Sequence, residues 1–334
     1  MTTIVDDLTR RGLLTGAGTL GLLTLMPTAG WSQEAGPFPV TITHAYGKTT
    51  VPEEPERVVS VGFNDHDAIV ALGVIPVGVA TWFDEYPTGF PWVLERYGDT
   101  PPESVGLFYE LNFEKVAALR PDLVIGVSGM DEAPYKTLSR IAPTVPPPPE
   151  SEDKTGPSRE EIQLAIGRAL GREDRAKNLN TRIATLFATA REAHPEFQGR
   201  TAVLAEYYSD VVRVRGSAEV WSQFLIALGF EVPTDVVGAD YKEFSREQIE
   251  ELADLDALVW NFYTPDGRPA LESDSIYQQL DVATEGRAVL VGPEDTISEA
   301  IGHNSALSLP LVLDAMVPKL AAAIDGDPVT EVPS

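Results

Sequence analysis

Residues 110–119 read ELNFEKVAAL and residues 243–252 read EFSREQIEEL, so the chain repeats a ten-residue pattern at a constant offset of 133 positions (243 − 110). In both copies apolar residues recur at helical spacing after a polar start. A short apolar strand follows each copy: DLVIGV after the first and DALVWNF after the second. The repeat therefore predicts two similarly built lobes, each with a helix that leads into a buried strand.

The start of each repeated helix carries the same polar arrangement. Asn112 and Ser245 can cap the two helices, and Glu114 and Glu247 fall in the first turns. A carboxylate there favours a helix by about 0.3–1 kcal/mol through the helix dipole, and Ser245 with Gln248 forms a capping box. Helix stability accounts for each glutamate separately, but not for their equivalent places in both lobes, so we favour a functional role.

The alternation of apolar strands with helical segments predicts an α/β fold. With 334 residues the chain exceeds the usual size of a single core. We expect two Rossmann-like lobes with parallel-type sheets, joined by a single helix about 30 Å long. The expected segments are an export signal and tail over residues 1–35, an N-terminal lobe over 36–172, a bridging helix over 173–194 and a C-terminal lobe over 195–334.

The composition excludes several classes of function. The chain has 25 Lys and Arg against 51 Asp and Glu, a net charge of −26, which argues against binding to nucleic acid. It has no cysteine, so thiolate zinc sites, iron–sulfur sites and a lipid-bearing cysteine are excluded. Four histidines are scattered along the chain, without metal-ligand spacing, and we predict no metal site; they are His44, His66, His194 and His303.

The N-terminal segment resembles a twin-arginine (Tat) export signal. Arg10 and Arg11 precede a moderately apolar run over residues 12–29 that contains several Gly and Thr. A transmembrane anchor is the alternative, but this run is a weak span beside the usual ~20 strongly apolar residues. We expect export by the Tat machinery to the periplasm or the outer face of the cell envelope, without a lipid anchor on cysteine.

Aromatic and polar residues follow the predicted strands of both lobes. In open α/β sheets ligands gather beyond the carboxyl ends of the strands, and aromatic rings there suit a large, partly apolar ligand. We expect Trp82 and Tyr263, in loops, to serve function, and Trp260 and Tyr207, inside strands, to pack in the core. The candidate ligand-binding residues are Asn64, Asp65, Trp82, Phe83, Tyr109, Ser128, Tyr208, Arg213, Arg215, Trp221, Phe262 and Tyr263.

Two of these candidates are cations in an otherwise acidic protein. Arg213 and Arg215 alternate along VVRVRG, so they point to the same side of their strand. They could hold a ligand carboxylate or a negatively charged metal chelate. Pairing with surface acids is an equally good account.

The segments LNFEKVAALRPDLVIGV and SREQIEEL, together with the bridging helix, resemble the iron–siderophore binding proteins of ABC importers, a group that includes cobalamin- and haem-binding members. NDHDAIVALGVIPVGVATWF, FPWVLERYG and LSLPLVLDAMVPKLAAAI look like the form common in actinobacteria. The resemblance implies a ligand cleft between the lobes, slight closure, and docking of Glu114 and Glu247 onto permease arginines. Two features depart from it: there is no lipidated cysteine, and TGPSREE stands where relatives often carry a tryptophan.

The resemblance leads us to expect a monomeric solute-binding protein, not an enzyme, that delivers a ferric siderophore to an ABC permease without a cofactor of its own. Iron would be coordinated by the siderophore. Haem or cobalamin binding is the nearest alternative, with Tyr109, Tyr208, Tyr263 or His66 as a haem ligand. A siderophore-modifying enzyme and a receptor for free Zn or Mn are further alternatives; the latter needs several His and carboxylates to converge.

Overall fold

Two separate sheets organise the chain in the computed structural model, which describes residues 37–149, 157–208, 211–293 and 296–325. The sheet of the N-terminal lobe has the order β6-β5-β4-β3-β7-β8. Its strands are parallel except β6, which pairs antiparallel with β5 at one edge. The strands are β3 (Val58–Ser60), β4 (Gly78–Thr81), β5 (Glu103–Leu107), β6 (Glu110–Leu111), β7 (Leu123–Ile125) and β8 (Thr144–Val145).

The sheet of the C-terminal lobe is mixed, with the order β11-β10-β9-β12-β13. β9, β12 and β13 are parallel, whereas β10 and β11 pair antiparallel at one edge. Only two residues separate β9 from β10, too few for a parallel crossover. The strands are β9 (Ala202–Tyr208), β10 (Val211–Val214), β11 (Lys242–Ser245), β12 (Ala257–Asn261) and β13 (Ala288–Val291).

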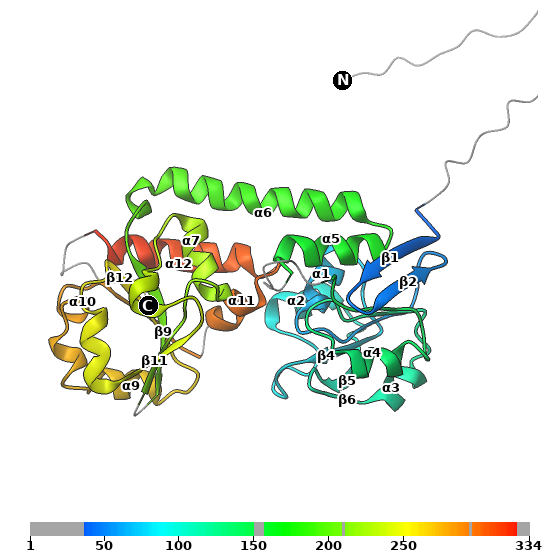
Figure 1. Ribbon diagram of the computed structural model, residues 1–334, viewed down its shortest axis with the longest axis horizontal. Coiled ribbons are helices and arrows are strands. Elements are labelled where there is room, and N and C mark those ends of the chain that lie inside the picture. Colours follow the sequence, from blue (N-terminus) through cyan, green and yellow to red (C-terminus); the bar gives the residue numbers. More distant parts are fainter. Residues whose placement is uncertain (1–36, 150–156, 209–210, 294–295, 326–334) are drawn as a thin grey trace, which may run out of the picture. The chain divides into compact units, whose positions relative to one another are not determined.

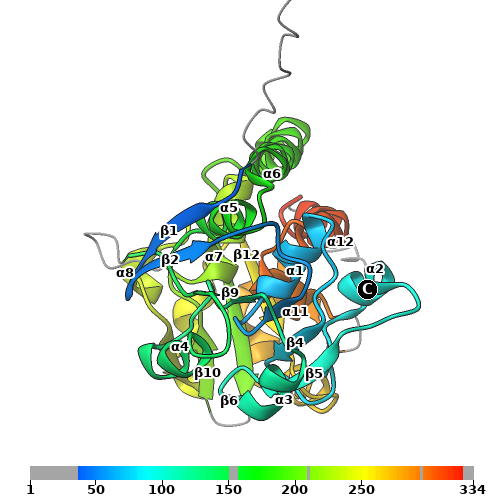
Figure 2. The ribbon, with the colours of Figure 1, turned by 90° about the vertical axis from the view of Figure 1, so that its right-hand side faces the viewer.

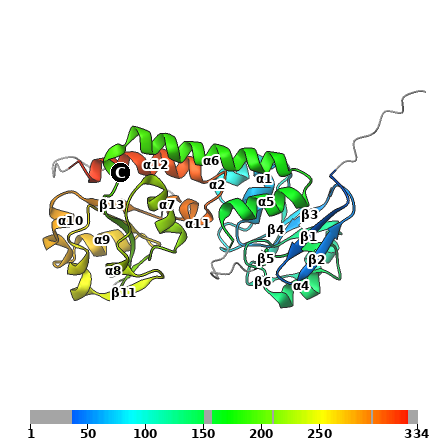
Figure 3. The same ribbon diagram turned by 45° about the horizontal axis from the view of Figure 1, so that its top comes forward.

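A single long helix, α6 (Glu173–Ala193), runs from one lobe to the other, as predicted (Figures 1 and 3). In the N-terminal lobe it follows α5 (Arg159–Ala169), whose start is fixed by a capping box between Ser158 and Glu161. The remaining helices of this lobe are α1 (Asp65–Ala71), α2 (Pro91–Tyr97), α3 (Phe113–Ala118) and α4 (Glu132–Leu138). A hairpin of β1 (Val40–His44) and β2 (Gly47–Val51) lies beside α5 (Figure 2).

The helices of the C-terminal lobe include α7 (Val220–Leu228), α11 (Ile297–His303) and α12 (Leu309–Ala323), and α12 packs along α6. A short 3₁₀ turn, η3, covers Tyr277–Gln279. The shorter elements are α8 (Thr234–Val237), η2 (Arg246–Leu252), α9 (Gly267–Glu272) and α10 (Asp281–Thr284).

Strands in the middle of both sheets are buried on both faces. Successive residues of β3, Val58 and Val59, enter two different hydrophobic clusters, and so do Val259 and Trp260 of β12. Because side chains alternate across a strand, a strand covered by helices on both faces must be apolar throughout. This explains the uninterrupted apolar runs in the sequence.

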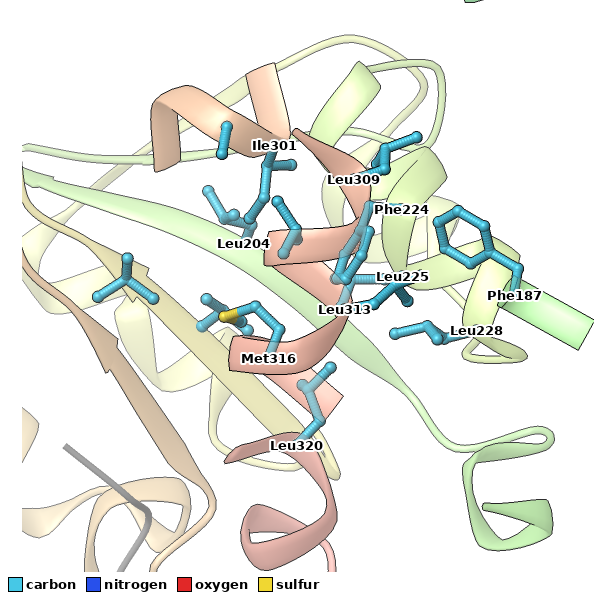
Figure 4. Close-up of a cluster of buried hydrophobic side chains, with 14 of the residues drawn as sticks. Phe187, Leu204, Phe224, Leu225, Leu228, Ile301, Leu309, Leu313, Met316 and Leu320 are labelled. Atoms are coloured by element: carbon cyan, nitrogen blue, oxygen red, sulfur yellow. The ribbon is translucent and has the colours of Figure 1, made fainter. Parts of the chain in front are cut away.

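One hydrophobic cluster crosses from lobe to lobe. It joins Phe90 and Trp92 at the start of α2 to Phe187 of α6 and to Leu313 and Met316 of α12. Figure 4 shows part of this cluster, with side chains of α6, α7, α11 and α12 around β9. The lobes are therefore held together by a shared apolar core as well as by α6, and the chain from Pro37 onward forms one compact unit.

The sequence repeat is a structural repeat. Each copy begins with an antiparallel edge strand, β6 or β11, and continues into a helical segment, α3 or η2. Asn112 Oδ1 accepts a 3.0 Å hydrogen bond from the Lys115 amide, and Ser245 forms the predicted capping box with Gln248. The second copy differs in being a 3₁₀ helix.

No helix within the described residues is both long and apolar enough to cross a membrane. The predicted signal residues Arg10 and Arg11 lie outside the residues that the structure describes.

Candidate functional site

Two adjoining cavities lie where residues of the two lobes meet. We call the first the Trp221 cavity; its volume is about 490 Å³, and Phe63, Trp82, Phe83, Tyr208, Arg215, Trp221, Tyr263, Ser298, Glu299, Gly302 and His303 line it. The second, the Gln163 cavity, measures about 330 Å³. Phe63, Trp82 and Gly302 line both, so the two form one cleft of the size that binds small ligands.

Arg215 is the cation in the wall of the Trp221 cavity. Its guanidinium lies 4.3 Å from the centre of the Trp221 ring, and its side chain is 15% exposed. It also contacts Glu206, and its Nη1 lies 3.3 Å from Glu219 Oε2. Stacking on the ring and ion pairing fix the plane of the guanidinium on the cavity wall.

The Glu206 carboxylate contacts several polar groups of this wall. It is 1% exposed, at the end of β9, and its Oε1 accepts a 2.8 Å hydrogen bond from Tyr263 Oη. Tyr208 Oη donates to Oε2 at 3.4 Å, and Arg213 Nη1 lies 3.9 Å from the same oxygen. Burial, followed by the charge of Glu206, raises the pKa of Tyr263 well above its ordinary value, so Tyr263 remains a neutral donor.

The Gln163 cavity is lined by amides and hydroxyls. Gln163 on α5 is 2% exposed, and its Nε2 has no hydrogen-bond partner; Asn64 Oδ1 also lacks one. Ser128 and Ser305 add hydroxyl groups to the lining. Buried polar atoms without partners are costly, which suits a site that hydrogen-bonds to a ligand.

Asp65 does not line this cavity but hydrogen-bonds to the loop that does. The carboxylate is completely buried and accepts hydrogen bonds from the amides of Val127, at 2.6 Å, and Ser128, at 3.0 Å. The Ser128 hydroxyl donates to it as well. Burial raises the pKa of Asp65 to about 6, although these hydrogen bonds act in the opposite direction. Asp65 therefore positions the loop after β7, and its predicted direct contact with a ligand is corrected.

The structure places most of the other predicted ligand-binding residues on the cleft. Those that line it are Asn64, Trp82, Phe83, Ser128, Tyr208, Arg215, Trp221 and Tyr263.

Besides Asp65, three predicted residues do not line the cleft. Phe262 is 1% exposed and packs in the core, because side chains alternate along the chain and its neighbour Tyr263 faces the cavity. Tyr109 is 64% exposed and only touches Trp82 edge-on. Arg213 pairs with Glu243 at 3.0 Å and stacks over Tyr241.

The structure agrees with the expected core packing of Trp260 and Tyr207, and it places Trp82 and Tyr263 on the cavity wall. Trp82 and Tyr263 are each 40% exposed on the cavity wall. Trp260 is completely buried, and Tyr207 packs against the same cluster while its hydroxyl donates to Asp274 at 3.1 Å.

Two of the four scattered histidines, His66 and His303, meet across the lobes. His66 and Asp67 begin α1, and His303 ends α11. One nitrogen of each imidazole and a carboxylate oxygen of Asp67 lie within 4.8 Å of one another, and all three residues are buried. Sequence gives no signal for this cluster, because its members come from opposite ends of the chain.

Sequence reasoning also missed several cleft residues. Gln163 and Arg159 line the Gln163 cavity from α5, a helix that we predicted but did not connect with the cleft. Glu206 had one available signal: a carboxylate in an otherwise apolar strand is rare without a paired cation.

The four candidate haem ligands are poorly placed. Tyr208 and Tyr263 share Glu206 as an acceptor. Tyr109 lies outside the cleft lining, and His66 is buried in the His–Asp cluster. Among the described residues, none of these four offers an unengaged ligand atom to the cavities.

Glu114 and Glu247 are both exposed, one on each lobe. Each occupies the second position of its helical segment, directly after an edge strand.

Comparison with known proteins gives consistent matches. Residues 65–294 match the family model described as periplasmic binding protein. The probable siderophore-binding lipoprotein YfiY of Bacillus subtilis (strain 168) is 28% identical over 74% of this chain and 78% of its own. The Fe(3+)-citrate-binding protein YfmC of the same organism is 30% identical over 62% of this chain and 63% of its own.

Among solved structures, a periplasmic solute binding protein from Mycobacterium smegmatis str. MC2 155 superposes with a TM-score of 0.76. It is 32% identical, and the match covers 85% of this chain and 98% of that one.

Proposed function

This chain belongs to the periplasmic binding protein family, and on that premise we propose that it captures a ferric siderophore in the interlobe cleft and delivers it to an ABC permease for iron uptake. The relatives named for siderophore and Fe(3+)-citrate binding support this ligand class. Such a protein binds and releases its ligand without changing it.

The observation that carries the proposal is the pairing of a fixed cation with aromatic walls. Arg215, stacked on Trp221, places its guanidinium on the wall of a cavity that Phe63, Trp82 and Phe83 also line. The oxygen atoms of a ferric carboxylate or hydroxamate chelate carry partial negative charge, and the arms of the chelator can be apolar. A guanidinium can bind such oxygens through two parallel hydrogen bonds, and the rings can cover the apolar parts.

The polar atoms of the Gln163 cavity extend the same surface. Gln163 Nε2 can donate and Asn64 Oδ1 can accept, so this region suits amide or hydroxyl groups on the arms of a chelator. The arrangement favours a siderophore over haem, since the tyrosines that could ligate haem already donate to Glu206.

We propose that the permease contacts one glutamate in each copy of the structural repeat. Glu114 and Glu247 are exposed on equivalent elements of the two lobes, and their positions suit simultaneous contact with two basic sites on a permease.

The test is tryptophan fluorescence titrated with ferric siderophores of the hydroxamate, catecholate and carboxylate classes, with haem and cobalamin alongside. Trp82 and Trp221 line the cleft, so a bound ferric chelate should quench them. We expect saturable quenching by one siderophore class, reduced in Trp82→Phe and Trp221→Phe. Trp260→Phe is the matched control, because Trp260 is buried in the core. Binding of haem alone, or of no chelate, would overturn the proposal.

A further inference from the structure

The contact between the lobes contains three buried metal-ligand side chains whose donor atoms lack hydrogen-bond partners. Neither ring nitrogen of His66 has a partner, and Asp67 Oδ1 and His303 Nδ1 have none either. The three residues are at most 3% exposed. A neutral imidazole always carries one N–H, so His66 buries an unsatisfied donor, which costs about 1–3 kcal/mol.

The spacing of these atoms suits a metal ion. His66 Nε2 lies 3.4 Å from Asp67 Oδ1, and His303 Nδ1 lies 3.6 Å from Asp67 Oδ2. Ligands about 2.0–2.2 Å from a tetrahedral zinc ion are separated from one another by roughly 3.3–3.5 Å. One ligand atom from each of the three residues lies within 4.8 Å of the other two.

The surroundings of the cluster hold its carboxylate in place. Asp67 Oδ2 accepts hydrogen bonds from Ser305 Oγ at 2.6 Å and from Trp92 Nε1 at 2.8 Å, which leaves Oδ1 for an ion. Such outer hydrogen bonds orient the ligands of protein metal sites.

We propose that His66, Asp67 and His303 form a binding site for a divalent transition ion of the zinc type, which ties the two lobes together. Two imidazoles and one carboxylate are typical donors for such an ion, and water or the Ser305 hydroxyl can complete the set. This ion is distinct from the iron of the siderophore. His303 also lines the Trp221 cavity, so an ion can enter from the cleft.

The site makes a structural prediction for the cleft as well. Asn64 Nδ2 donates to the carbonyl of His303, so the start of α1, which borders the Gln163 cavity, is tied to α11, which borders both cavities. An ion here would fix the distance between the walls of the cleft.

The experiment uses the full chain without a histidine tag, stripped with a chelator and titrated with Zn²⁺ against a chromophoric competitor. We expect one Zn²⁺ per chain, a higher melting temperature, and visible absorption of tetrahedral geometry with Co²⁺. His303→Asn should weaken Zn²⁺ binding by at least about tenfold and abolish the rise in melting temperature. His194→Asn is the matched control, because His194 pairs with Glu196 at the surface, 2.8 Å away, outside the cluster.

A second measurement, on the protein without substitutions, does not depend on whether the variants fold. With ¹⁵N-labelled histidine, Zn²⁺ should shift the imidazole signals of two of the four histidines, and the spectra of His44→Asn and His194→Asn should identify the unshifted pair. Absence of stoichiometric Zn²⁺ binding overturns the proposal. So does binding that survives His303→Asn in a folded protein, or a shift of any other pair of histidines.

Discussion

Tyr263 donates a 2.8 Å hydrogen bond to Glu206 Oε1, the same buried carboxylate oxygen that Arg215 contacts. A single acidic side chain thus fixes a hydroxyl and a guanidinium on the wall of the Trp221 cavity. Because the carboxylate is 1% exposed, it depends on these partners for compensation of its charge.

Arg215→Met should therefore destabilise the fold by about 3–5 kcal/mol, since it leaves the Glu206 carboxylate buried without its cation. Adding Glu206→Gln should recover much of that stability but not the affinity for the ferric siderophore. Denaturant unfolding and fluorescence titration measure the two effects. Arg268→Met is the control, expected to cost about 0–1 kcal/mol, because Arg268 and its partner Glu272 are both exposed. Recovery of full affinity in the double variant would show that Arg215 does not contact the ligand.

Glu114→Ala combined with Glu247→Ala should leave siderophore affinity unchanged and abolish transport, because both carboxylates are exposed and outside the cleft lining. Radioactive iron uptake in cells and fluorescence titration of the purified protein are the measurements. Glu95→Ala with Glu192→Ala, two exposed glutamates on α2 and α6, is the matched pair that should transport normally. Normal uptake by the Glu114 and Glu247 double variant contradicts the docking role.

Gly302→Ala should weaken ligand binding by about tenfold while the fold remains stable. A methyl group on Gly302 would come 2.9 Å from Trp221 Cζ2, so the ring must move and its stacking on Arg215 must change. Overpacking of this kind costs about 1–3 kcal/mol, whereas Ala is favoured over Gly within a helix. In a Trp221→Phe background the smaller ring removes the collision, so Gly302→Ala should then have little further effect on affinity.

We expect acid to weaken the ion pair between Asp274 and Arg246, and so to destabilise η2, the segment that carries Glu247. Arg246 is the main cause that lowers the pKa of the Asp274 carboxyl below its ordinary value of 3.8, with help from the Ile276 amide and Tyr207. A lowered pKa in the folded state means that the stabilisation is fully present above pH 3.8 and is lost as the pH falls through the folded-state value. Denaturant unfolding should show a shallower acid loss in Asp274→Asn than in the original protein. Asp254→Asn, at an exposed carboxylate, should leave the slope unchanged.

Arg10→Lys with Arg11→Lys should leave the protein in the cytoplasm, because the twin-arginine machinery reads that pair. Cell fractionation with immunodetection measures the distribution. Substitution of Arg57 and Arg120, a pair in the folded part, by lysine is the control that should still be exported. Export of the signal variant would point to another route.

Much of the fold could be predicted because its signals are local. The bridging helix was expected over residues 173–194, and α6 spans Glu173–Ala193. The antiparallel edge of the C-terminal sheet was not predicted, because apolar runs do not reveal strand direction.

The cleft was predictable only in part. Residues that follow strands, such as Trp82 and Tyr263, were found by position, and Phe262 was misassigned because a shift of one residue reverses the face. The meeting of His66 with His303 depends on how the two lobes pack, which no local pattern encodes.

The hydrophobic cluster that crosses between the lobes has a thermodynamic consequence. Separation of the lobes would expose Phe90, Trp92 and Leu313 to water, so the cleft is formed before the ligand arrives. Little ordering entropy then opposes binding, and little apolar area is newly buried beyond the contact with the ligand. Ligand binding in such a receptor therefore stores no strain that could later drive release of the ligand. The work of release must come from the transporter, which has to pull the walls of the cleft apart against that shared core.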